Sequence, residues 1–146
     1  MTQSFRAPTA IERIFNSIFG FLIGIGVAPS NKYLLQVRGR KSGKLFSTPI
    51  NQLEFAGKRF LVAPRGQTQW VRNAEAANEI TLKKGSSRSK FRLRPLHDQE
   101  KLEVLKAYLD KFRREVQTYF SVRAGSPVEA FASVADNYPA FELIPI

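Results

Sequence analysis

The chain has 146 residues, of which 43% are hydrophobic and 24% are charged, and its formal net charge is +11. This length supports one domain with a substantial core but is short for two, and the apolar content excludes general disorder. The absence of cysteine excludes disulfides, thiolate metal ligands and a cysteine nucleophile. The excess of cations indicates an anionic partner: a nucleic acid, an acidic membrane surface or a small polyanionic ligand.

The first expected element is an amphipathic helix. Apolar residues recur at helical spacing over residues 11–23, and Thr9 with Glu12 forms a capping box before them. The most apolar stretch, residues 18–27, is too short to cross a bilayer, and its flanks do not fit an export signal. We expect a cytoplasmic protein. Its helix would pack across the end of a barrel, cover a ligand as a lid, or touch the inner face of a membrane from its periphery.

We expect one domain, with residues 1–28 as its N-terminal helix and residues 29–146 as a β-barrel. Apolar runs and alternating patterns predict strands at residues 33–37, 45–50 with 51–55, 60–63, 79–84, 89–96 and 141–146. Helices are predicted after Thr68, after Asp98 as a cap, and at residues 128–134. Six or so strands joined mostly by tight turns predict an α+β, mainly β protein built on a small antiparallel barrel.

A basic turn links the first two predicted strands. Residues 37–44 read Val-Arg-Gly-Arg-Lys-Ser-Gly-Lys, which places four cations and a hydroxyl within eight residues, and the two glycines permit the turn. Exposed backbone N–H groups beside Arg and Lys form a concave anion site suited to a phosphate or a polycarboxylate. The alternative is a solvated basic hairpin, and spacing alone does not separate the two interpretations.

A second candidate anion site is the segment from Pro64 to Thr68, which joins a buried strand to a helix. A helix N-terminus offers free N–H groups and a positive dipole, and Gly66 lets a ligand approach the backbone. Trp70 and Asn73 lie one turn apart on that helix and offer a flat apolar surface and an amide to the same pocket. The alternative places Trp70 in the core and Asn73 in solvent.

Conventional catalytic sets are absent from the sequence. The single histidine, His97, lies beside Asp98 at a strand-to-helix junction, where a capping or solvated role is the usual one. One histidine without cysteine makes a transition-metal site improbable, and the serines lack the context of a hydrolase nucleophile. If the protein is an enzyme, we expect a cofactor to carry the chemistry.

Taken together, these segments resemble the deazaflavin-dependent nitroreductase family of split β-barrels, which is related to the flavin-binding pyridoxamine-phosphate-oxidase-like barrels. The resemblance runs from about Tyr33 to Leu96 and rests on the order and spacing of Gly39-Arg40-Lys41-Ser42-Gly43, Thr48-Pro49, Val62-Ala63, Gly66 and Trp70-Val71-Arg72-Asn73. It implies an oxidoreductase that transfers hydride from a reduced 8-hydroxy-5-deazaflavin coenzyme to a hydrophobic acceptor such as a quinone or a nitroaromatic. No obligate nucleic-acid partner is implied.

The resemblance also implies cofactor-binding residues, while the catalytic residues stay unassigned. Arg40, Lys41, Ser42 and Gly43 would hold the phosphate and acidic tail of the coenzyme. The groove beside the ring would be lined by Thr48, Pro49 and Asn51, backbone contacts would come from Val62, Ala63, Pro64, Arg65 and Gly66, and Trp70 with Asn73 would close one wall. For a proton donor, the sequence offers Tyr33, Tyr138 or water.

The sequence departs from the family pattern at two positions. Phe46 stands where many members carry an arginine, and Asn51 stands where some carry a tyrosine beside the ring. Loss of one cation weakens binding of an anionic tail by about 1–3 kcal/mol unless Lys44 or Arg65 compensates. The alternatives are a non-catalytic barrel that binds flavin mononucleotide (FMN), a tetrapyrrole, a fatty acid or single-stranded nucleic acid.

Overall fold

The computed structural model describes residues 31–146 of the chain. The predicted N-terminal helix and the boundary at residue 28 lie outside the described residues. Within them, no helix is long and apolar enough to cross a membrane.

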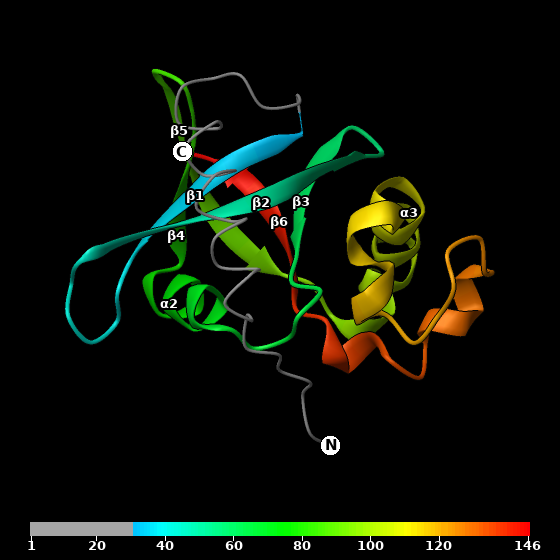
Figure 1. Ribbon diagram of the computed structural model, residues 1–146. Helices are drawn as coiled ribbons and strands as arrows, with labels where there is room; N and C mark the ends of the chain where they lie inside the picture. Colours follow the sequence, from blue (N-terminus) through cyan, green and yellow to red (C-terminus); the bar gives the residue numbers. More distant parts are fainter. Residues whose placement is uncertain (1–30) are drawn as a thin grey trace.

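The described chain is a closed, six-stranded antiparallel barrel with two α-helices (Figure 1). The strands are β1 (Lys32–Arg38), β2 (Leu45–Phe55), β3 (Lys58–Val62), β4 (Glu79–Lys84), β5 (Ser87–Pro95) and β6 (Ala140–Pro145). The helices are α2 (Gln69–Ala77) and α3 (Asp98–Val116), followed by the 3-10 turns η1 (Gln117–Tyr119), η2 (Val128–Phe131) and η3 (Ala135–Asn137). Around the barrel the order is β1-β2-β3-β6-β5-β4, and β4 pairs with β1 to close it. The prediction of a mainly β, six-stranded antiparallel barrel is therefore confirmed.

Three local predictions were wrong. Residues 45–55 form one continuous strand rather than two, and Pro49 lies inside it opposite Leu34. The helix predicted at residues 128–134 is the single 3-10 turn η2. Helix α3 takes His97 as its N-cap, one residue before the predicted Asp98.

The barrel has two cores because β3 is covered on both faces. Leu61 points into the barrel interior with Leu35, Phe141 and the α2 residue Val71. Its neighbours Phe60 and Val62 point outward, as alternation along a strand requires, and pack beneath α3. Such a strand reads as a continuous apolar run, which is the pattern at residues 60–63.

Helix α3 covers the outer core and then bends toward β1 and β2. Leu105, Tyr108, Leu109 and Phe112 recur at three- and four-residue spacing and are buried. The backbone of Phe112 leaves helical geometry, with φ −107° and ψ 22°. The turn beyond it reaches the cavity described below.

Candidate functional site

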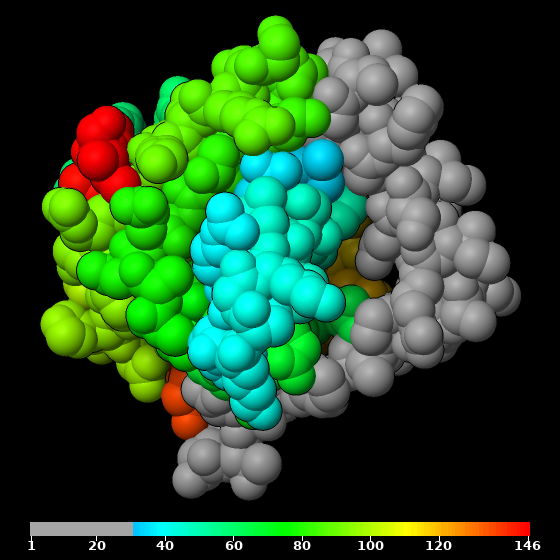
Figure 2. All heavy atoms as spheres, turned by 90° about the vertical axis from the view of Figure 1, so that its left-hand side faces the viewer, coloured from blue at the N-terminus to red at the C-terminus, as the bar shows by residue number. Residues whose placement is uncertain are grey.

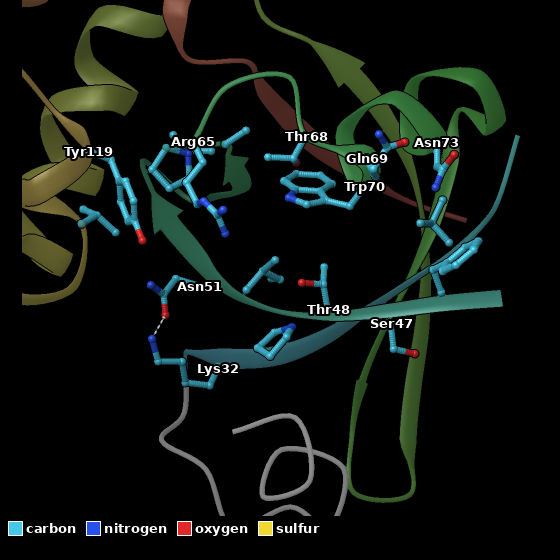
Figure 3. Close-up of a pocket in the computed structure, with 18 of the residues that line it drawn as sticks. Lys32, Ser47, Thr48, Asn51, Arg65, Thr68, Gln69, Trp70, Asn73 and Tyr119 are labelled. Atoms are coloured by element: carbon cyan, nitrogen blue, oxygen red, sulfur yellow. Dashed lines mark hydrogen bonds between the residues drawn. The ribbon is translucent and has the colours of Figure 1, made fainter. Parts of the chain in front are cut away.

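A cavity of about 950 Å³ lies between β1 and β2, the loop after β3, the start of α2 and the end of α3. In the close-up, Ser47, Gln69 and Asn73 lie at one end, Thr48 and Trp70 in the middle, and Lys32, Asn51, Arg65 and Tyr119 at the other end (Figure 3). The cavity brings together all the predicted site residues except Gly43 and Gly66, namely Arg40, Lys41, Ser42, Thr48, Pro49, Asn51, Val62, Ala63, Pro64, Arg65, Trp70 and Asn73. Segments far apart in the sequence therefore form one elongated site.

The basic turn has a fixed backbone shape. The Gly39 N–H donates to the Lys44 carbonyl at 2.7 Å, and the Gly43 N–H donates to the Gly39 carbonyl at 2.9 Å. Gly43 has φ 72°, where a side chain would be strained. The Ser42 hydroxyl accepts a hydrogen bond from the Lys44 N–H at 3.2 Å, so it shapes the turn as well as lining the cavity. Figure 2 shows this hairpin, in cyan, on the face seen from the left of Figure 1.

Asn73 joins the basic turn to α2. Its side-chain oxygen accepts hydrogen bonds from the backbone N–H of Arg40 at 3.0 Å and from Arg40 Nη1 at 2.8 Å. Gln69 Oε1 accepts a further bond from Arg40 Nη1 at 3.1 Å. Asn73 is only 5% exposed, so the alternative of a solvent-facing residue was wrong. Side-chain hydrogen bonds thus join the basic turn to α2, and the helix sets the position of the turn.

Trp70 combines both roles that the sequence left open. Its ring packs against the barrel core, 6.4 Å from the Phe141 ring centroid at a tilt of 59°, and it also lines the cavity. In Figure 3 its indole faces the space above Thr48. This arrangement provides a flat apolar wall in the middle of the site.

The opposite end of the cavity carries an ion pair that the sequence did not reveal. Lys32 is the cross-strand partner of Asn51, and its ammonium donates hydrogen bonds to Asn51 Oδ1 and to Glu115 Oε1. The Lys32 side chain is 13% exposed and that of Glu115 is 47% exposed. Burial lowers the pKa of Lys32 to about 8, against an ordinary 10.5.

Two tyrosines line the same end of the cavity. Tyr108 is fully buried, and burial raises the pKa of its phenol, while a hydrogen bond with Asn51 partly opposes that shift. Tyr119 faces the Arg65 guanidinium, whose carbon lies 5.8 Å from the ring centroid. Neither Tyr33 nor Tyr138, the tyrosines expected as proton donors, lines the cavity. Tyr138 instead stacks on Phe120 in the outer core.

Phe46, at the position where the resemblance implied an arginine, also lines the cavity. Its ring lies so close to the turn that a Cβ at Gly39 would meet Phe46 Cε2 at 2.6 Å. Of the two cations considered as substitutes, Lys44 is not a lining residue, and Arg65 lies near Tyr119 at the other end (Figure 3).

The residues present fit an elongated anionic coenzyme with a planar ring. The cavity is of ordinary size for a small-molecule site, and it joins a cationic end to an aromatic wall. Thr68 Oγ1 is buried on this wall and has no hydrogen-bond partner among the described residues. A buried hydroxyl left in this way offers a polar contact to a bound ligand.

Comparisons with solved structures identify the class of fold. The chain resembles a domain-swapped dimer (22% identity, 91% of this chain and 92% of that chain, TM-score 0.55). It also resembles an F420-H2 dependent reductase (21% identity, 78% and 94%, TM-score 0.52). A protein of unknown function from Agrobacterium tumefaciens str. C58 has the same fold (16% identity, 97% and 58%, TM-score 0.55). No curated protein matches the sequence.

These likenesses establish the barrel fold. The family profile described as F420H(2)-dependent quinone reductase matches residues 6–125. The chain therefore belongs to the F420H(2)-dependent quinone reductase family, and it is a deazaflavin-dependent oxidoreductase whose coenzyme is F420. The family expected from the sequence is confirmed.

Proposed function

We propose that this protein reduces a hydrophobic acceptor, a quinone or a nitroaromatic, in the cavity between the basic turn and the end of α3. The observation that supports this most strongly is the lining of that cavity. Arg40 and Lys41 lie at the turn, the flat ring of Trp70 lies in the middle, and the other end combines the apolar Ile50 and Val116 with Tyr108 and the charged groups of Lys32, Arg65, Arg114 and Glu115. Such a site accepts a charged tail, a ring and an apolar molecule in that order along its length.

The basic turn would hold the anionic part of the coenzyme. Arg40 and Lys41 supply charge, while the Ser42 hydroxyl supplies a hydrogen-bond donor. Asn73 fixes the Arg40 backbone before any ligand arrives, which lowers the cost of ordering this end on binding.

The middle of the cavity would place the ring. Thr48 from β2 lies on one side, and Trp70 and Thr68 from the start of α2 lie on the other (Figure 3). When bound, the reduced coenzyme supplies a hydride. The task of these walls is to hold the donor carbon and the acceptor about 3–3.5 Å apart and to exclude water between them.

The test is a fluorescence titration, because Trp70 is the only tryptophan of the chain. We expect F420 to quench Trp70 emission saturably and FMN to bind more weakly. Replacement of Lys41 by alanine should weaken F420 binding about 10- to 150-fold, since charged hydrogen bonds contribute about 1.5–3 kcal/mol. Reduced F420 with a lipophilic quinone should then show turnover.

A matched control removes a cation elsewhere. Lys90 is exposed on β5 and does not line the cavity, so Lys90→Ala lowers the net charge equally and should leave F420 affinity within twofold. If the two substitutions weakened F420 binding equally, Lys41 would act only through the net charge of the protein and not through contact with the coenzyme. Absence of saturable quenching by F420 would contradict the proposed function.

A further inference from the structure

The end of the cavity away from the basic turn holds the Lys32–Glu115 pair, for which the hydride transfer itself has no use. With the anionic part of the coenzyme at Arg40 and Lys41, the space beside this pair is left for the acceptor. This step rests on the proposed function.

Reduction of a quinone also needs a proton. A quinone becomes a hydroquinone by gaining one hydride, which carries two electrons, and one proton. The hydride comes from the reduced coenzyme, which is oxidised in the same step. A group that donates the proton as charge develops on the acceptor oxygen accelerates such a step by about 10²–10⁴-fold.

Lys32 has the position and the charge for this task. Its ammonium lies on the cavity wall, oriented by Asn51 and Glu115, with most of the side chain shielded from water. Burial lowers the pKa of Lys32 to about 8, and contact with the Glu115 carboxylate favours the charged form. At neutral pH the group is therefore protonated, yet it is a stronger acid than an ordinary lysine.

We propose that Lys32 is the acid that protonates the reduced acceptor, and that Glu115 is a positioning residue that holds its ammonium toward the cavity. One N–H bond of the ammonium breaks, and an O–H bond of the hydroquinone forms. The neutral amine left behind recovers a proton from water. Water reaches the ion pair through Glu115, whose side chain is half exposed.

Other titratable or charged groups approach this end from several elements. Beyond Glu115 itself, α3, η1 and the loop after β3 bring the lining residues Tyr108, Arg114, Tyr119 and Arg65. The buried Tyr108 holds its proton more tightly than an ordinary phenol because burial raises its pKa. Tyr119 is the other side chain at this end that could donate the proton to the acceptor. The test therefore includes Tyr119→Phe.

The first readout requires no coenzyme. Competitive labelling of the protein with acetic anhydride over a pH series, read at the Lys32 peptide by mass spectrometry, gives the pKa of this amine. We expect about 8. Replacement of Glu115 by glutamine should lower it further, because the carboxylate that favours the ammonium is gone.

The second readout is kinetic. Lys32→Met should slow quinone reduction about 10²-fold or more and abolish the solvent deuterium isotope effect, with F420 affinity by Trp70 quenching within threefold of the parent protein. In the parent, the rate should fall as the pH rises through the Lys32 pKa, since the acid must be protonated. In Glu115→Gln this fall should move to lower pH.

Lys32→Arg and Tyr119→Phe are the matched controls. Arginine keeps the positive charge and the ion pair but cannot release its proton, so the rate should stay low while folding and F420 binding persist. Tyr119→Phe should keep the pH profile of the parent.

The outcomes separate the two proposals. Normal F420 binding with unchanged quinone reduction in Lys32→Met, full activity in Lys32→Arg, or loss of the pH dependence in Tyr119→Phe would overturn the role of Lys32 alone. Failure of the parent protein to bind F420 would overturn the proposed function, and this inference with it.

Discussion

Asn73 shows how one buried amide organises the site at the scale of a residue. It sits on α2 and accepts two hydrogen bonds from Arg40, which is 33 positions earlier in the chain. A buried polar side chain must satisfy its hydrogen bonds, and here that need fixes the distance between the hairpin and the helix.

We predict that Asn73→Ala lowers the free energy of unfolding by about 1 kcal/mol and weakens F420 binding, because a part-buried backbone N–H and a guanidinium lose their acceptor. Urea unfolding and Trp70 quenching measure the two effects. Asn73→Asp retains an acceptor oxygen and should keep the turn in place. An alanine variant with parent-like stability would show that the turn holds its shape without α2.

The residues of the site differ in how far the sequence could identify them. The basic turn and Trp70 were visible because their glycines, charges and aromatic ring form a local pattern. The position of Lys32 could have been predicted from the sequence. The hairpin register runs unbroken from Arg38↔Leu45 to Lys32↔Asn51, so counting along the strands gives the cross-strand partner of Asn51. Glu115 and Tyr119 come from the other end of the chain and carry no local signal for this cavity.

At the scale of elements, the start of α3 is held to the barrel by a charged network. Arg94 at the end of β5 donates to Glu142 on β6 at 3.0 Å and to Glu100 in the first turn of α3 at 3.1–3.3 Å. Glu100 also accepts a hydrogen bond from the backbone N–H of His97 at 3.0 Å. The backbone hydrogen bond with His97 and the side-chain bond with Arg94 lower the pKa of Glu100 below its ordinary 4.5.

We predict that Glu100→Gln lowers the melting temperature at pH 7 and that this difference disappears in acid. A carboxyl group whose pKa is depressed by folding stabilises the fold above its unfolded pKa and stops doing so as the pH falls through the folded value. Thermal unfolding of the parent and of Glu100→Gln between pH 7 and pH 2 gives the pH range over which the difference in melting temperature disappears. Glu103→Gln, on the exposed side of the same helix, controls for the lost charge, and a difference that persisted at pH 2 would contradict the electrostatic origin.

Helix α3 also shows what periodicity predicts and what it does not. The spacing of Leu105, Tyr108, Leu109 and Phe112 predicted a helix, and its apolar side lies on the outer face of β3. The bend at Phe112 was not predictable because no proline or glycine marks it. It is this bend that leads to Glu115 at the cavity.

At the scale of the whole molecule, the charge of +11 indicated an anionic partner, which could be a nucleic acid, an acidic membrane surface or a small polyanionic ligand. Among the described residues, Phe60, Phe91, Phe112, Phe120, Phe131 and Phe141 are buried, and Phe46 is the exposed phenylalanine. A surface that stacks successive bases needs several exposed rings, so the described surface gives little support to single-stranded nucleic acid as the partner.

The closure of the barrel depends on β6, which pairs with β3 on one side and β5 on the other. We predict that a chain ending at Pro139 does not unfold cooperatively, because it loses Phe141 and Leu143 from the barrel interior. Their burial contributes several kcal/mol, comparable with the whole stability of a domain. Differential scanning calorimetry measures the cooperativity of unfolding. As a control, a chain that lacks only the exposed Ile146 should melt like the parent. Cooperative melting of the chain ending at Pro139 would show that five strands suffice for the fold.

The barrel cannot close during synthesis in the cell until its last strand, β6, has been translated. Phe60 on β3 pairs with Glu142 on β6, so a ribosome must produce the whole intervening chain before the ring of strands can join. Until then the nascent polypeptide presents two unpaired strand edges, the kind of surface on which chains aggregate. We expect the interval between translation of β5 and translation of β6 to be the period when this protein most needs a chaperone.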